Sequence, residues 1–123
     1  MDSILTSVKK LLGISEEYTH FDADLVMHIN SVFMVLNQLG VGPSSGFSIT
    51  GKEETWGNYL PADANLDLVK SYVYQKVKLL FDPPQSSSVL DAMKRMIDEF
   101  EWRLQVEAES PDPESEEDHK NGV

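Results

Sequence analysis

Four side chains near the start of the second apolar segment have the types that bind metals or move protons. They are His20, Asp22, Asp24 and His28. Asp24 and His28 are four residues apart, so a helix would place them on one face, a spacing that suits two ligands of a metal ion. With His20 they would supply the three ligands and open position of a catalytic zinc site. Carboxylates also favour the first turn of a helix because its dipole is positive there. We favour this second interpretation and expect no metal or other cofactor.

A glycine-rich segment, residues 40–46 (GVGPSSG), superficially resembles a phosphate-binding loop. It lacks the preceding strand and the following Lys-Ser/Thr pair that give such a loop its mechanism. A helix stop followed by a loop explains the same residues. No Ser/His/Asp or Cys/His nucleophile arrangement can be assigned either, so the sequence predicts that the protein is not an enzyme.

The charge of the chain argues against nucleic-acid recognition. The formal net charge is −11 over 123 residues. Residues 107–123 hold seven acids and one lysine, a net of −6, and the other 14 acids and nine Lys/Arg give −5. Affinity for DNA comes mainly from Lys and Arg that displace counterions. We therefore expect no specific binding of nucleic acid.

The composition also limits the class of protein. There is no cysteine, which excludes disulfides and thiolate metal sites. The N-terminus lacks the pattern of a signal peptide, and we expect no membrane span. The most apolar stretch, residues 25–41, falls short of the ~20 mostly apolar residues that a span needs. It is interrupted by His28, Asn30, Ser31, Asn37 and Gln38.

Hydrophobic periodicity predicts an all-α fold, a small bundle of about four helices. The helices are expected over residues 4–12, 22–39, 64–81 and 86–106. Gly13 and Gly40 follow the first two patterns and are typical helix stops. Pro83 ends the third, because proline cannot continue the hydrogen-bond ladder. Thr19 and Asp22 have the spacing of a capping box for the second helix.

Two segments lie outside these helices. Residues 41–51 (VGPSSGFSITG) have turn residues at both ends and predict a loop or short hairpin arm between the second and third helices. Residues 107–123 are rich in Ser, Pro, Asp and Glu and lack aromatics, which predicts a disordered acidic tail. The chain is thus divided into a helical domain, residues 1–106, and a tail, residues 107–123.

From Leu25 to Gly51 there are 27 consecutive residues without Asp, Glu, Lys or Arg. A helix that is apolar or neutral all round is usually covered on more than one side. A chain of this length can rarely cover every side alone, so we expect neighbouring subunits to cover part of it. The expected interface residues lie on second stripes of the second and third helices. They are Met27, Asn30, Met34, Asn37, Leu68, Tyr72 and Leu79.

Three large aromatic residues are candidate anchors for a partner, because aromatics bury a large area with little loss of entropy. Trp56 and Tyr59 lie in a short segment before Pro61, and Trp56 suits the core and an interface equally. Trp102 lies about 200° around its helix from Phe100, which faces inward, so an interface role is favoured.

Several segments together resemble the head–tail connector, or adaptor, proteins of tailed phages and prophages. These form a head-completion and DNA-packaging family. The matching segments, in order, are SILTSVKKLLGI (3–14), FDADLVMHINSVFMVLNQLGVGP (21–43), ETW (54–56), KSYVYQKVKLLFDPP (70–84) and EFEWRL (99–104). The resemblance covers residues 3–104, and the acidic tail has no counterpart in it.

The resemblance implies a helical subunit of a ring, commonly twelve-fold, in the neck of the virion. Such a ring lies beneath the portal protein, extends the DNA channel and offers a platform to a stopper or tail-completion protein. It is assembled in the cytoplasm of the bacterial host, and DNA passes through without specific binding. The family has no catalytic residues. The expected contacts to the portal or neck are Phe47, Ile49, Trp56, Tyr59, Trp102 and Arg103.

Other functions remain open at this stage. An acidic inhibitor that mimics DNA would need ordered rows of carboxylates, whereas over half of the net charge lies in the predicted tail. A free-standing cytoplasmic helical adaptor would differ from a connector only in its protein partner. An enzyme would have to use the cluster around His20 and His28.

Overall fold

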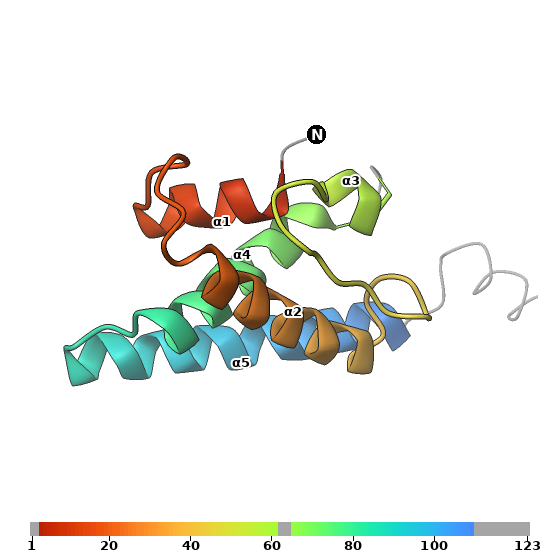
Figure 1. Cartoon of the computed structure of the whole chain (residues 1–123). Helices are drawn as coiled ribbons and strands as arrows, with labels where there is room; N and C mark the ends of the chain where they lie inside the picture. Colours follow the sequence, from red (N-terminus) through yellow and green to blue (C-terminus); the bar gives the residue numbers. More distant parts are fainter. Residues whose placement is uncertain (1–2, 62–64, 110–123) are drawn as a thin grey trace, which may run out of the picture.

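The computed structural model describes residues 3–61 and 65–109 of the chain. These residues form five helices, labelled in Figure 1: α1 (Ile4–Leu12), α2 (Asp22–Gln38), α3 (Trp56–Tyr59), α4 (Leu66–Phe81) and α5 (Ser87–Glu109). The described residues contain no strand, only an isolated antiparallel bridge between Ser3 and Thr55. The predicted all-α fold is confirmed. The one-turn helix α3 lies in the short segment before Pro61.

Helix α1 begins and ends where its sequence predicts. The Ser3 hydroxyl accepts a hydrogen bond from the backbone N–H of Thr6 at 3.2 Å. Gly13 ends the helix with φ of 81°, the left-handed conformation that glycine adopts without steric cost. The capping box predicted for α2 is wrong: Phe21 occupies the N-cap position and makes no side-chain cap hydrogen bond. The Asp22 carboxylate is instead engaged by Lys9 of α1.

Helix α4 ends at Phe81, directly before Asp82 and the two prolines, as predicted. Helix α5 continues to Glu109, past its predicted end at Val106, so the first residues of the predicted tail are helical. Residues 110–123, the remainder of that predicted tail, lie outside the described residues.

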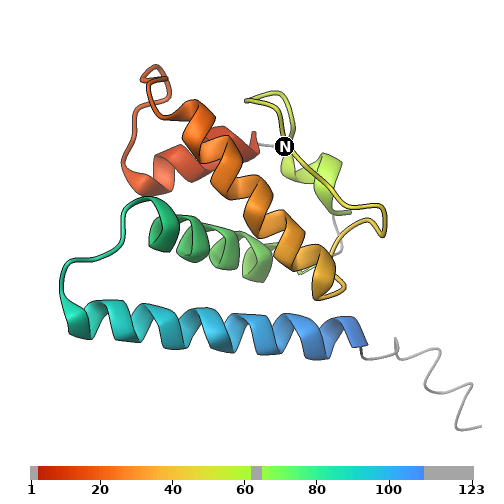
Figure 2. The same ribbon diagram turned by 60° about the horizontal axis from the view of Figure 1, so that its bottom comes forward.

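Helix α4 is the centre of the structure. Helices α2 and α5 both pack on it, and α1 crosses both α2 and α4. Figure 2 shows α2 lying across α4, and α5 running along the other side of α4. The core is formed by Ile4, Leu5 and Val8 of α1, Leu25, Ile29, Val32, Phe33 and Leu36 of α2, Ile49 of the loop, Trp56 and Tyr59 of α3 with Leu60 after it, Val69, Tyr72, Val73 and Val77 of α4, and Met93, Ile97 and Leu104 of α5. Each such apolar side chain contributes roughly 1.5–3 kcal/mol relative to full exposure.

The segment between α2 and α3 is a loop rather than a hairpin, and it returns along the flank of α2 (Figure 1). The side chain of Asn30 holds its middle by two hydrogen bonds to the backbone of Ile49. Further along, the Glu54 carboxylate accepts hydrogen bonds from the N–H and hydroxyl of Thr50, both at 2.9 Å. These side chains replace the ladder of backbone hydrogen bonds that a hairpin would form.

The loop also depends on a glycine. Gly42 has φ of 87°, and a Cβ atom built there would lie 2.6 Å from the ring of Tyr59. Tyr59 itself is buried against Phe33, with ring centroids 4.5 Å apart. Glycine at position 42 therefore allows both the left-handed backbone conformation and the close approach of α3 to the loop.

Candidate assembly surface

Three of the four residues that could have bound a metal make ring contacts or an ion pair, and the fourth, Asp24, is exposed. His20 lies edge-on to Phe21, and His28 edge-on to Phe81, with ring centroids 4.8 and 6.3 Å apart. Asp22 Oδ1 lies 2.8 Å from Lys9 Nζ. Within residues 3–61 and 65–109, no group of three or more His, Cys, Asp or Glu side chains has the geometry to hold a metal ion.

Lys9 is the buried charge that sequence reasoning missed. Its side chain is 3% exposed, and its ammonium group also donates hydrogen bonds to the carbonyls of Glu16 and Tyr18, at 3.0 and 2.8 Å. The ammonium group therefore has three oxygen neighbours, two carbonyls that accept its hydrogen bonds and the Asp22 carboxylate in an ion pair. Lys9 fastens α1 to the following loop and to the start of α2. From the sequence alone, a lysine in the last turn of a helix is expected to be solvated. Its role in linking α1 to the loop and to α2 is seen only in the fold.

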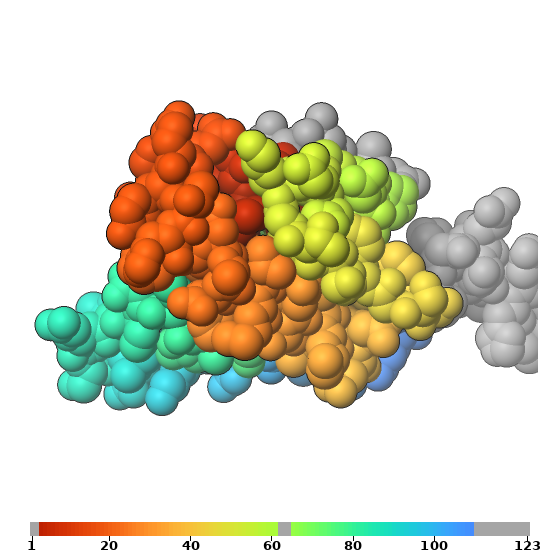
Figure 3. All heavy atoms as spheres, in the orientation of Figure 1, coloured from red at the N-terminus to blue at the C-terminus, as the bar shows by residue number. Residues whose placement is uncertain are grey.

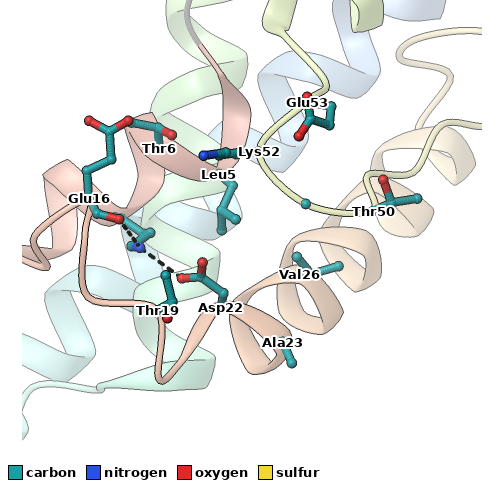
Figure 4. A pocket seen from close by; sticks show the side chains of 12 residues that line it. Leu5, Thr6, Glu16, Thr19, Asp22, Ala23, Val26, Thr50, Lys52 and Glu53 are labelled. Atoms are coloured by element: carbon teal, nitrogen blue, oxygen red, sulfur yellow. Dashed lines mark hydrogen bonds and ion pairs between the residues drawn. The ribbon is translucent and has the colours of Figure 1, made fainter.

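Lys9 lines a hollow of about 590 Å3 between α1, the start of α2 and residues 50–53. Figure 3 shows this depression, with atoms of α1 at its base. In Figure 4, dashed lines at Asp22 and at the backbone of Glu16 mark their ion pair and hydrogen bond with the ammonium of Lys9. Lys52 and Glu53 line its outer part. The lining thus carries charges of both signs, and the ammonium of Lys9 is engaged within the subunit.

The structure corrects the expected contact role of five residues, because their side chains serve the subunit itself. Ile49, Trp56 and Tyr59, expected at the portal or neck, are buried in the core. Tyr72, expected at the subunit interface, is also buried. The carboxamide of Asn30, expected on the same interface, is engaged by the loop. These side chains are not available to a partner in this conformation.

The corrected aromatics have specific partners inside the fold. The indole N–H of Trp56 donates to the hydroxyl of Ser7 at 2.8 Å, and Lys70 Nζ lies 5.7 Å from the centre of the Trp56 ring. The Tyr72 hydroxyl donates to Glu101 Oε2 at 2.7 Å, and Lys76 Nζ lies 3.2 Å from the same oxygen. Glu101 thus joins α4 to α5, a link that apolar periodicity does not reveal.

The outer face of α2 carries exposed methionines. Met27 is 58% and Met34 65% exposed, and Ser31 lies between them on the same side of the helix. Asn37, in the last turn, is exposed as well. The inner stripe of α2 is covered by the subunit's own core, whereas this outer stripe is not. The core and the loop thus cover part of the uncharged segment, and a charge-free stripe of α2 with two methionines stays exposed.

A second exposed apolar surface lies on α5. Trp102 is 64% exposed and borders a shallow hollow that it shares with Leu68 of α4. Arg103 beside it forms an ion pair with Glu99, with 2.8 Å between Nη2 and Oε1. Leu68 and Leu79 of α4, and Phe47 of the loop, are partly buried against the core. Of the residues expected to contact partners, Met27, Met34, Asn37, Trp102 and Arg103 are exposed.

A family model described as phage connector protein matches residues 4–111, which is most of the chain. The chain belongs to the phage connector protein family. This confirms the resemblance carried by the segments from Ser3 to Leu104. Connector proteins are structural components of a phage virion. Comparisons with curated proteins and with solved structures gave no match. None of the described helices is both long enough and apolar enough to cross a bilayer.

Proposed function

We propose that this connector protein is the subunit of a ring in the phage neck, where it joins the portal protein to the stopper or tail-completion protein. The observation that carries the proposal is the outer face of α2. In a connector protein of net charge −11, this face carries two exposed methionines, Met27 and Met34, in a segment of 27 residues without any charge. Exposed apolar patches of this kind mark protein contacts.

In the proposed ring, commonly twelve-fold in such proteins, the outer face of α2, which includes Asn37, contacts the adjacent subunit. Leu68 and Leu79 of α4 contribute to the same contact. Phe47 and Arg103 lie on surfaces free to contact the portal or the next neck component. The ring is assembled in the host cytoplasm and becomes part of the virion neck. Membership of the connector family favours this role over an acidic inhibitor that mimics DNA and over a free-standing cytoplasmic adaptor.

DNA passes through the channel of the proposed ring without specific binding. The net charge of −11 supports this, because like charge raises the free energy of close approach between the protein and the phosphate backbone. The proposal requires no catalytic step, and the paired state of Lys9, Asp22 and Glu101 is consistent with a purely structural role.

Negative-stain images of the purified chain, with and without the portal protein of the same phage, test the proposal. We expect a ring stacked on the portal. Met34→Glu should prevent ring formation, because it places a charge in the uncharged face. Leu11→Glu, at an exposed position of α1, is the matched control and should leave the ring intact. Free monomers under both conditions would contradict the proposal.

A further inference from the structure

The two most exposed large hydrophobic side chains among the described residues are Met34 and Trp102, on different helices. Met34 borders a hollow of about 250 Å3 on the surface of α2 and the loop, here called the α2 hollow. The α2 hollow is lined by Asn30, Phe33, Met34, Asn37, Gly46, Phe47 and Ser48. None of these residues is charged. An apolar anchor and an uncharged, aromatic-lined hollow are therefore both present on one subunit.

The indole of Trp102 is unused within the subunit. It points away from the side of α5 that carries Met93, Ile97 and Leu104, and its N–H has no hydrogen-bond partner among residues 3–61 and 65–109. An exposed tryptophan beside an Arg–Glu ion pair has the composition of an interface hot spot with a polar rim. Its counterpart must be apolar with one hydrogen-bond acceptor, which is the character of the α2 hollow.

The charge of the chain favours a second copy of this chain as the partner that binds in the α2 hollow. A basic partner would be drawn to the acidic surfaces of this chain rather than to its neutral face. Another subunit, which carries the same net charge of −11, can approach at low electrostatic cost only where charge is absent. The α2 hollow lies in the uncharged segment from Leu25 to Gly51.

The two surfaces suit a head-to-tail contact. Helices α2 and α5 both pack on α4 rather than along each other, so anchor and hollow form separate patches. Figure 2 shows α2 and α5 finishing at the same end of the molecule. The α2 hollow is lined by residues from the second half of α2, and Trp102 belongs to the last third of α5. A contact between two different patches on identical subunits is heterologous, and such contacts close into rings when the rotation is suitable.

We propose that Trp102 of one subunit inserts into the α2 hollow of the next subunit around the ring. This inference rests on the proposed ring. It assigns Trp102, with Phe47 and Arg103, to the contact between subunits instead of to the portal. The indole packs against Phe47 and the thioether of Met34, an arrangement in which sulfur and aromatic ring attract. Its N–H donates to the carboxamide oxygen of Asn37, while the Glu99–Arg103 pair stays at the wet rim.

Cross-linking tests the inference directly, because the chain contains no cysteine. The double variant S48C/R103C places one thiol beside the α2 hollow and one beside Trp102. Rings assembled on the portal are treated with a short bismaleimide. We expect a ladder of dimers, trimers and higher oligomers, since every head-to-tail contact can be linked. The matched control S48C/D91C keeps the first thiol and moves the second to the start of α5, and it should give no ladder.

A further substitution tests whether the contact depends on Trp102 itself. Adding Trp102→Ala to S48C/R103C should lower the ladder yield at least about tenfold, as expected for a hot-spot residue. Val89→Ala, at another exposed position of α5, should leave the yield unchanged. Circular dichroism verifies that both variants keep the fold. Rings that form without a ladder, or a ladder that survives Trp102→Ala, would overturn the inference while leaving the ring itself standing. Absence of any ring on the portal would refute the proposed function and this inference with it.

Discussion

The carboxamide of Asn30 forms hydrogen bonds with both backbone groups of Ile49. Its Nδ2 donates to the Ile49 carbonyl at 2.9 Å, and its Oδ1 accepts from the Ile49 N–H at 2.7 Å. One side chain of α2 thus pairs with the loop as a neighbouring strand would. Ile49 is buried as a result, and the loop is held along the flank of α2 beside the α2 hollow.

Asn30→Ala should destabilise the isolated subunit by about 2–3 kcal/mol, because the buried N–H and carbonyl of Ile49 lose their partners. Urea unfolding measures the loss, and faster hydrogen exchange at Ile49 would locate it in the loop. Asn37→Ala, an exposed amide on the same helix, is the control and should change the stability by less than about 0.5 kcal/mol. Equal effects of the two substitutions would contradict the role assigned to Asn30.

Gly42→Ala and Gly46→Ala separate backbone strain from steric clash. The two glycines have φ of 87° and 89°, but only at Gly42 would a Cβ atom meet the Tyr59 ring. We expect about 1 kcal/mol of destabilisation for Gly46→Ala, from the backbone alone. Gly42→Ala should cost about 3 kcal/mol, because the ring or the loop must also move. Thermal unfolding of the two variants side by side checks this, and similar melting temperatures would refute the close approach.

Lys9→Met should destabilise the fold by about 3 kcal/mol, because it leaves two carbonyls and the Asp22 carboxylate without their donor. Asp22→Asn should cost only about 1 kcal/mol, since the Asp22 side chain is 31% exposed and water can replace part of the interaction. Denaturant unfolding of both variants measures the difference. A Lys9→Met protein as stable as the parent would show that the buried ammonium is dispensable.

Two buried tyrosines predict a loss of stability in alkali. Burial raises the pKa of Tyr59 and of Tyr72, and for Tyr72 the hydrogen bond to Glu101 and the charge of Glu101 raise it further. The unfolded chain releases these protons near pH ~10, whereas the folded chain retains them. Stability should therefore be unaffected by these groups below about pH 10 and should fall above it. Urea unfolding across that range, compared with the double variant Tyr59→Phe/Tyr72→Phe, measures the effect; an equally steep fall in the variant would contradict it.

The same tyrosines differ near neutral pH. The Tyr59 hydroxyl is buried and has no hydrogen-bond partner in the described part of the chain, so Tyr59→Phe should be neutral or slightly stabilising. Tyr72→Phe removes the donor to Glu101 and should cost about 1 kcal/mol. Unfolding free energies of the two single variants at neutral pH test the contrast, and a larger loss for Tyr59→Phe would reverse the assignment.

Helix positions follow from short-range rules, which explains why they could be predicted. Ser3 and Gly13 bound α1, and the prolines after Asp82 follow α4, because caps and helix breakers act over a few residues. The capping box at Thr19 and Asp22 was predicted wrongly for the opposite reason. A buried ammonium from α1 engages Asp22, and sequence spacing contains no information about that long-range contact.

The side chains at the candidate surface were predicted less well. Periodicity places Met27 and Met34 on one stripe of α2, and the structure leaves that stripe exposed. The same reasoning assigned Tyr72 and Asn30 to a second surface, yet α5 covers Tyr72 and the loop occupies Asn30. A helix pattern shows which residues share a face. Which face the rest of the chain covers depends on the fold of the whole molecule.

A cryo-electron microscopy reconstruction of the assembled phage neck, with this chain located in it, tests the central claim most directly. The account predicts a neighbouring copy of the same chain lying over Met27 and Met34, so that the uncharged face of α2 is buried between subunits. A neck in which these two side chains face solvent, with no copy against α2, would contradict it.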